Sequence, residues 1–256
     1  MSANRLTRLF GLIAVGILSV SADAAEWGHV TGTVVLTGPV PMPALLVAQG
    51  DPAVKDAVCR GQDVRDDSLR VDAESRGIAN VFVFLNRAPA LIHSDLQSPA
   101  ASELVFDQKG CRFLPHAMVV HTGQTVLVKS DDPTNHNTHT NPFFNTPENF
   151  LVQANNRAGV PLTFQQREPV PVKVTCDIHP WMTAYWLVVD HPYAALTGER
   201  GEFTIENLPV GAHKLRVWHE RAGWIDRALS IDIKAGETVT QPPIEVPLER
   251  LTATKE

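Results

Sequence analysis

This sequence of 256 residues has few cysteines, methionines and tyrosines, and it lacks both helical periodicity and the motifs of hydrolytic enzymes. It contains three cysteines, four methionines and two tyrosines. No long stretch shows the apolar spacing of an amphipathic helix, whereas proline and glycine recur at short intervals. There is no Gly-x-Ser-x-Gly motif, no phosphate-binding loop and no recognisable pair of catalytic carboxylates, so hydrolysis and phosphoryl transfer have no support. We expect an all-β protein that is not an enzyme.

Basic residues are also few. The 22 lysines and arginines are outnumbered by 28 acidic residues, which gives a formal net charge of −6. No basic stripe follows any segment of the chain. Because nucleic-acid-binding surfaces depend on clustered positive charge, we expect no nucleic-acid partner.

The N-terminus predicts export. Arg5 and Arg8 precede an apolar run, Leu9 to Val20, which is too short to span a bilayer, and small residues follow up to Ala25. Residues 1–25 are therefore predicted to be a cleaved signal peptide, with a retained anchor as the alternative. We expect a periplasmic or secreted protein with no membrane span after cleavage.

The most informative segment runs from Cys176 to Met182. It places a thiolate, the imidazole of His179 and a thioether in one short loop, and these are side chains that a mononuclear blue-copper centre takes as ligands. The alternation of Val172 and Val174 with polar residues predicts a strand that aims the sulfur of Cys176 inward. A buried thiolate needs a cation beside it.

The missing ligand of such a centre is a histidine from a distant loop. His136 lies about forty residues upstream, after a predicted strand from Thr125 to Lys129. His139 in the same loop is a competitor, and Met182 has the alternative role of core packing. We expect one copper ion at a type 1 site that cycles between Cu(II) and Cu(I).

Residues 101 to 190 resemble the cupredoxins, and the tight Cys-x-x-His-x-x-Met spacing resembles amicyanin more than plastocyanin. The segment from Cys111 to Pro115 is similar to a cupredoxin strand opening, and Gly123 to Val126 is similar to the turn that leads into the next strand. His136 followed by Asn137 resembles the His-Asn pair of the family. The resemblance implies a Greek-key β-sandwich.

The resemblance also implies residue roles. His136, Cys176 and His179 would be equatorial copper ligands, Met182 the weak axial ligand, and Asn137 a hydrogen-bonding partner of the cysteine loop. The implied function is one-electron transfer.

His179 is then the expected exposed edge of the site. Pro180 and Trp181 would form an apolar landing patch around it, although a buried core position is the alternative for Trp181. The implied partner is a c-type cytochrome or another periplasmic redox protein, in an amine-oxidising chain of the methylamine-utilisation type. The alternatives are a copper-delivery protein and a structural β-sandwich module with a vestigial site.

The two remaining cysteines predict a disulfide. If Cys176 binds metal, Cys59 and Cys111 are left as a pair in an oxidising compartment. A rival interpretation places Cys111 in a second metal site with His116 and His121. These histidines are five residues apart in a predicted strand and therefore point to opposite faces, which disfavours that site.

A second module follows the cupredoxin-like segment. The pattern from Gly201 to Gly211, Gly-x-Phe-x-Ile-x-x-Leu-Pro-x-Gly, resembles carboxypeptidase-regulatory or transthyretin-like β-sandwiches. The opening strands of that module are missing nearby, but residues 29–37 and 80–85 look like them, so the cupredoxin is either nested in the second sandwich or precedes it. We divide the chain into a signal peptide (1–25), an N-terminal β segment that contributes strands to the second sandwich (26–100), a cupredoxin domain (101–192), a second β-sandwich (193–250) and a tail (251–256).

Overall fold

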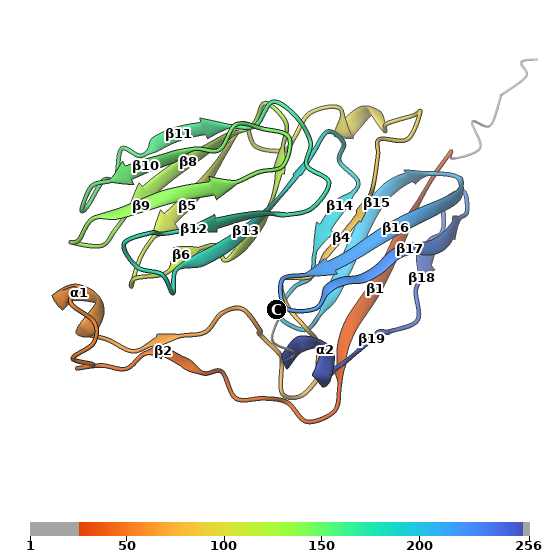
Figure 1. Ribbon diagram of the computed structural model, residues 1–256. Coiled ribbons are helices and arrows are strands. Elements are labelled where there is room, and N and C mark those ends of the chain that lie inside the picture. The colour runs from red at the N-terminus through yellow and green to blue at the C-terminus, as the bar shows by residue number, and fades with distance from the viewer. Residues whose placement is uncertain (1–25, 253–256) are drawn as a thin grey trace, which may run out of the picture.

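The structure, a computed structural model, describes residues 26–252 and consists almost wholly of β-strands in two packed sandwiches (Figure 1). The predicted all-β fold class is confirmed. The predicted signal peptide and the last four residues of the predicted tail lie outside the described residues. Between residues 26 and 252, no helix has the length and apolar character needed to cross a membrane.

The first sandwich contains the candidate site. One of its sheets has the strand order β10-β9-β12-β13-β7 and the other β11-β8-β5-β6. The strands are β5 (Glu103–Gln108), β6 (Phe113–Leu114), β7 (Ala117–His121), β8 (Thr125–Ser130), β9 (His136–Asn141), β10 (Asn149–Val152), β11 (Val160–Thr163), β12 (Val172–Thr175) and β13 (Thr183–Val189).

Alternation of side chains builds this first core. In β8 every second residue is buried, which places Val126 and Val128 inside and their neighbours outside. Phe106 and Phe164 each meet Trp186 edge to face within the same core. Large aromatic side chains thus fill the space between the two sheets. The candidate site lies beyond this core, in the loops at one end of the sandwich.

The second sandwich is built from both ends of the chain. One sheet has the order β15-β1-β18, with β19 also paired to β1, and the other has the order β14-β4-β16-β17. The strands are β1 (Trp27–Thr37), β4 (Phe82–Leu85), β14 (Ala194–Leu196), β15 (Glu202–Pro209), β16 (Gly211–His219), β17 (Gly223–Ile233), β18 (Thr238–Thr240) and β19 (Ile244–Pro247).

Strands distant in sequence complete this second sandwich. β1 pairs antiparallel with β15 and parallel with β18 and β19, while β4 lies between β14 and β16. The whole first sandwich therefore lies in sequence between strands that pair with one another. The short helices η1 (Ser94–Leu96) and α2 (Leu248–Thr252) belong to connecting and terminal segments.

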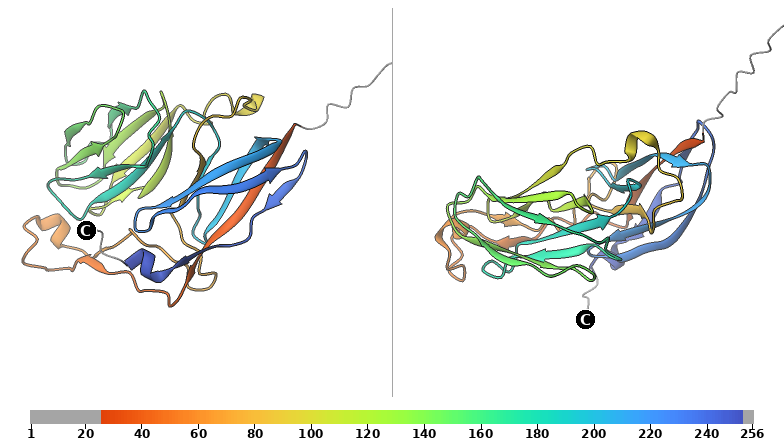
Figure 2. Two further views of the ribbon diagram at one scale, coloured as in Figure 1. Left: turned by 45° about the vertical axis from the view of Figure 1, so that its right-hand side comes forward. Right: turned by 90° about the horizontal axis from the view of Figure 1, so that it is seen from above.

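The two sandwiches pack through β4. All four of its residues are buried, because Val83 and Leu85 face the second core while Phe82 and Phe84 face Leu187 and other residues of the first sandwich. The nearly continuous apolar sequence of this strand follows from burial on both faces. Figure 2 shows the two sandwiches side by side in both views.

A segment of the N-terminal region crosses to the site end of the first sandwich, as the orange chain in Figure 1 shows. We call residues 45–65 the strap; it contains β2 (Leu45–Val47), α1 (Ala57–Arg60) and β3 (Val64–Arg65). Its buried residues Val47, Val54 and Val64 belong to the core of the first sandwich. Residues 39–78 are rich in proline, aspartate and arginine and show only weak periodicity, which is typical of an excursion outside the core, but the strap within them contributes buried side chains to it.

A disulfide anchors the strap. Cys59 of α1 is bonded to Cys111, with Cα atoms 5.6 Å apart, so the predicted pairing is confirmed. The rival metal site is excluded because Cys111 is not free. Cys176 is the free cysteine of the described chain, and it is buried.

Candidate metal centre

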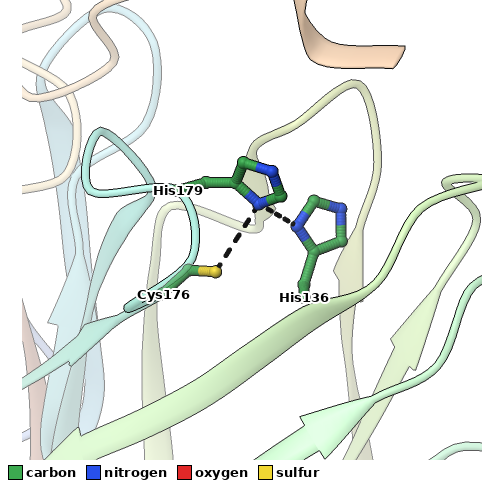
Figure 3. A group of neighbouring side chains, drawn as sticks. All are labelled: His136, Cys176 and His179. Carbon is green, nitrogen blue, oxygen red and sulfur yellow. Dashed lines mark hydrogen bonds between the residues drawn. The ribbon is translucent and has the colours of Figure 1, made fainter. Parts of the chain in front are cut away.

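Three ligand atoms converge at the end of the first sandwich (Figure 3). Nδ1 of His136 lies 2.8 Å from Nδ1 of His179, which lies 3.8 Å from Sγ of Cys176. All three atoms are within 4.8 Å of one another. The residues are at most 1% exposed, so the group forms a closed cluster of one sulfur and two nitrogens.

Strand pairing creates this convergence. β9 begins at His136 and runs antiparallel to β12, with His139 opposite Thr175. Continuing that register past the end of β12 brings the loop that starts at Cys176 beside the first residues of β9. The local sequence positions His179 by its spacing within the loop, and the sheet positions His136.

Met182 closes the loop. Its backbone N–H donates to the carbonyl of His179 at 2.9 Å, and its carbonyl accepts from the N–H of Cys176 at 3.2 Å. The side chain is 1% exposed and belongs to the same core cluster as Cys176. This placement suits both the axial role and the core-packing role.

Asn137 ties the loop to β9. Its Oδ1 accepts the backbone N–H of Asp177 at 2.7 Å and that of Ile178 at 3.3 Å, and it lies 3.3 Å from Sγ of Cys176. A side-chain oxygen thus takes the place of a backbone acceptor where the ladder between β9 and β12 stops. The predicted cross-loop hydrogen bonding of Asn137 is present in the structure.

His139 does not join the cluster. It is only partly buried in β9, and its Nδ1 contacts Oδ1 of Asp177 at 3.1 Å. Its side chain is one-third exposed. The structure therefore brings His136, rather than its competitor, to Cys176 and His179.

The pKa values of Cys176 and His136 are shifted in opposite directions, which favours a negative thiolate beside a positive imidazolium. Burial opposes thiolate formation at Cys176, but hydrogen bonds with His136 and His179 outweigh it and lower the pKa of the thiol to about 6. Burial also disfavours a charged His136, yet its bonds with Asp132 and Cys176 raise its pKa to about 9. The cluster thus favours a thiolate at Cys176 beside an imidazolium at His136.

Asp132 supports His136 from behind. Its Oδ2 lies 2.9 Å from Nε2 of His136 and accepts the N–H of Cys111 at 2.8 Å, while its Oδ1 accepts the N–H of Gly110 at 2.6 Å. These bonds hold the pKa of the carboxyl below its usual value despite burial, which acts in the opposite direction. The carboxylate fixes which ring nitrogen of His136 faces the cluster.

Asp56 of the strap lies over His179. Its Oδ2 is 3.6 Å from Nε2 of His179 and accepts the hydroxyl of Thr134 at 2.6 Å. His179 is 1% exposed, so the expected exposed edge is absent and that expectation is wrong. The physical reason is the strap, which the disulfide draws across the end of the sandwich.

The predicted landing patch is only partly open. Pro180 is exposed and Trp181 is half-buried, with its indole N–H donating to the carbonyl of Cys111 at 3.2 Å. Both residues line a cavity of about 520 Å³ whose other wall is strap residues 53–56. A partner at this face would meet the strap as well as the ligand loop.

The donor set suits copper. Two imidazole nitrogens and one thiolate, with a buried thioether close by in the chain, are the ligands of blue-copper electron-transfer sites. His136, Cys176 and His179 are the residues that could hold the ion, with Met182 as the fourth. Sequence reasoning missed Asp56 and Asp132. The position of Asp132, four residues before His136, could have indicated a contact between the two. Nothing in the sequence around Asp56 indicates its contact with His179.

No protein-family model and no curated protein matches this chain. Solved structures that resemble part of it include a reduced amicyanin in which tyrosine replaces a tryptophan, at 19% identity over 35% of this chain and 85% of that one, with a TM-score of 0.30. A purple cupredoxin from Nitrosopumilus maritimus matches at 17% identity over 33% of this chain and 97% of that one, with a TM-score of 0.28.

A copper-containing nitrite reductase from Thermus scotoductus matches at 20% identity over 40% of this chain and 25% of its own length, with a TM-score of 0.28. The case for metal binding at this site rests on the geometry and chemistry of its own residues.

Proposed function

We propose that this protein carries single electrons through one type 1 copper ion held by His136, Cys176 and His179, with Met182 as the weak axial ligand. The observation that carries the proposal is the convergence of two Nδ1 atoms and one thiolate sulfur in a buried cluster. Bound copper supplies a centre that gains and loses one electron between Cu(II) and Cu(I).

The surrounding residues hold the donors in place. Asn137 fixes the start of the ligand loop, and the backbone bonds between Met182, His179 and Cys176 fix its end. Donors held by packed and hydrogen-bonded side chains move little when the charge of the ion changes. A small rearrangement is what rapid one-electron transfer requires.

Two other functions have less support. A delivery protein must release its ion to another protein, but the three donors are buried and the strap covers His179. A structural module has no need for a buried thiol whose pKa is lowered to about 6. Electron transfer is compatible with both the buried donors and the lowered pKa of the thiol.

The proposed partner is a c-type cytochrome or another periplasmic redox protein, and the proposed location is the periplasm. Pro180 and Trp181 would take part in a small, weak contact of the kind that transient redox pairs use. The exposed side chain of Ile178 extends this apolar area.

Stopped-flow mixing tests the proposal. Reduced, copper-loaded protein is mixed with an oxidised c-type cytochrome, and reduction of the haem is followed by absorbance. We expect exchange with the wild-type protein and its loss in Cys176→Ser, with His139→Ala as the matched control that retains exchange. A wild-type protein that binds one copper ion but does not exchange electrons would contradict the proposal.

A further inference from the structure

Both candidate imidazole ligands present their outer nitrogen to a carboxylate. Nε2 of His136 lies 2.9 Å from Oδ2 of Asp132, and Nε2 of His179 lies 3.6 Å from Oδ2 of Asp56. The inner nitrogen of His179 lies 3.8 Å from Sγ of Cys176, and that of His136 lies within 4.8 Å of the same sulfur. Each imidazole is therefore placed between the candidate metal position and an acidic side chain.

The contact at His179 is the less expected of the two. Its Nε2 is a buried nitrogen without a hydrogen-bond partner in residues 26–252, and buried polar groups are normally hydrogen-bonded. Asp56 is the acidic group that faces it, at a distance slightly beyond a hydrogen bond. The hydroxyl of Thr134 donates to the same carboxylate oxygen and holds it in this position.

The disulfide between Cys59 and Cys111 links the segments that position the two carboxylates. Asp56 caps α1 by accepting the N–H groups of Val58 and Cys59 with its Oδ1, while its Oδ2 accepts from Thr134 and faces His179. Cys59 is bonded to Cys111, and the N–H of Cys111 donates to Asp132. One disulfide thus joins the segments that bring a carboxylate to each imidazole.

We propose that Asp56 and Asp132 are positioning residues that make the site favour the more highly charged oxidation state of its metal. This inference rests on the proposed function and names residues that tune it. A carboxylate behind a ligand imidazole fixes the ring and increases its basicity. Its negative charge stabilises Cu(II) more than Cu(I), because the attraction grows with the charge of the ion.

The reduction potential of the copper-loaded protein tests this inference. Asp56→Asn keeps an oxygen that can cap α1, because asparagine is as good an N-cap as aspartate, but it removes the charge. We expect Asp56→Asn to weaken Cu(II) binding relative to Cu(I) about tenfold, which raises the one-electron potential by about 59 mV. The thiolate-to-copper absorption band is retained, because Asp56 is not a ligand.

A matched control separates this effect from net charge and from strap folding. Asp63→Asn removes one charge from the same strap, where the carboxylate accepts the backbone N–H of Gln49, and it should leave the potential within a few millivolts of wild type. An unchanged potential in Asp56→Asn, with the absorption band present, overturns the inference while the proposed function stands. A wild-type protein with no such band defeats the proposed function itself.

A second variant keeps the inference testable if Asp56→Asn folds poorly. Thr134→Val retains the charge of Asp56 and removes the hydroxyl that competes for its Oδ2. The carboxylate is then free to approach Nε2 of His179, so we expect the potential to fall below that of wild type. A rise in the potential of Thr134→Val contradicts the inference.

Discussion

The indole N–H of Trp181 donates to the backbone carbonyl of Cys111 at 3.2 Å and so joins the ligand loop to the disulfide. The indole ring also lies 5.2 Å from the imidazole of His179, between ring centroids. Trp181 therefore contacts a candidate ligand on one side and the anchor of the strap on the other. Its role is to brace the loop as well as to border the proposed landing patch.

Replacing Trp181 with phenylalanine should weaken this brace while an aromatic side chain is kept. The variant loses one hydrogen bond and part of the packing of the indole, so we expect the free energy of unfolding to fall by at least about 1 kcal/mol, while the copper absorption band persists. Chemical denaturation and one absorption spectrum check both results. A variant as stable as wild type would mean that the bond to Cys111 contributes nothing.

The disulfide should account for much of the stability of the strap. Replacing Cys59 and Cys111 with alanine opens a loop that spans 52 residues, and the chain-entropy estimate for such a loop is roughly 4 kcal/mol. Thiol counting on denatured, unreduced, copper-free protein should give one free thiol, that of Cys176. Three reactive thiols would contradict the pairing.

His136 and His139 give a matched pair of variants. His136→Ala should weaken copper binding strongly, because a donor of the buried cluster is lost, whereas His139→Ala should change it by no more than about twofold. The difference is predicted because His139 contacts Asp177 at the surface instead of the cluster. Competition titration with a copper chelator measures both affinities, and equal effects would show that the upstream ligand is misassigned.

The thiol of Cys176 should titrate far below its ordinary range in the copper-free protein. Its pKa is lowered from 9.0 to about 6, so the thiolate is present above about pH 6 and is lost as the pH falls through that value. His136→Ala removes a hydrogen bond that favours the thiolate, and the midpoint should move upward.

Ultraviolet absorbance of the thiolate, recorded against pH, measures this midpoint. His139→Ala is the control, and its midpoint should match that of wild type. A midpoint near 9 in the wild-type protein would show that no imidazole stabilises the thiolate.

Local spacing made part of the site predictable. Cys176, His179 and Met182 occupy one short loop, so their proximity follows from the chain itself. The disulfide followed from cysteine parity once Cys176 was assigned to metal. An apolar run without alternation has no solvent face, so the burial of β4 on both faces is also predictable from its sequence.

Long-range placement was not predictable in the same way. Nothing near Asp56 in the sequence indicates that it lies over His179, 123 residues away, because that contact depends on how the strap crosses the end of the sandwich. The same contact explains why the expected exposed edge at His179 was wrong. Hydrophobic periodicity reports burial within an element but does not report which segment covers a loop.

The central claim is that the thiolate of Cys176 binds copper together with two imidazoles. Absorption spectroscopy of the wild-type protein and Cys176→Ser, each titrated with Cu(II), tests it most directly. We predict an intense visible thiolate-to-copper band that saturates at one copper ion per wild-type chain and is absent from a folded Cys176→Ser variant. A wild-type spectrum with only weak bands, or a band that survives in Cys176→Ser, would contradict the account.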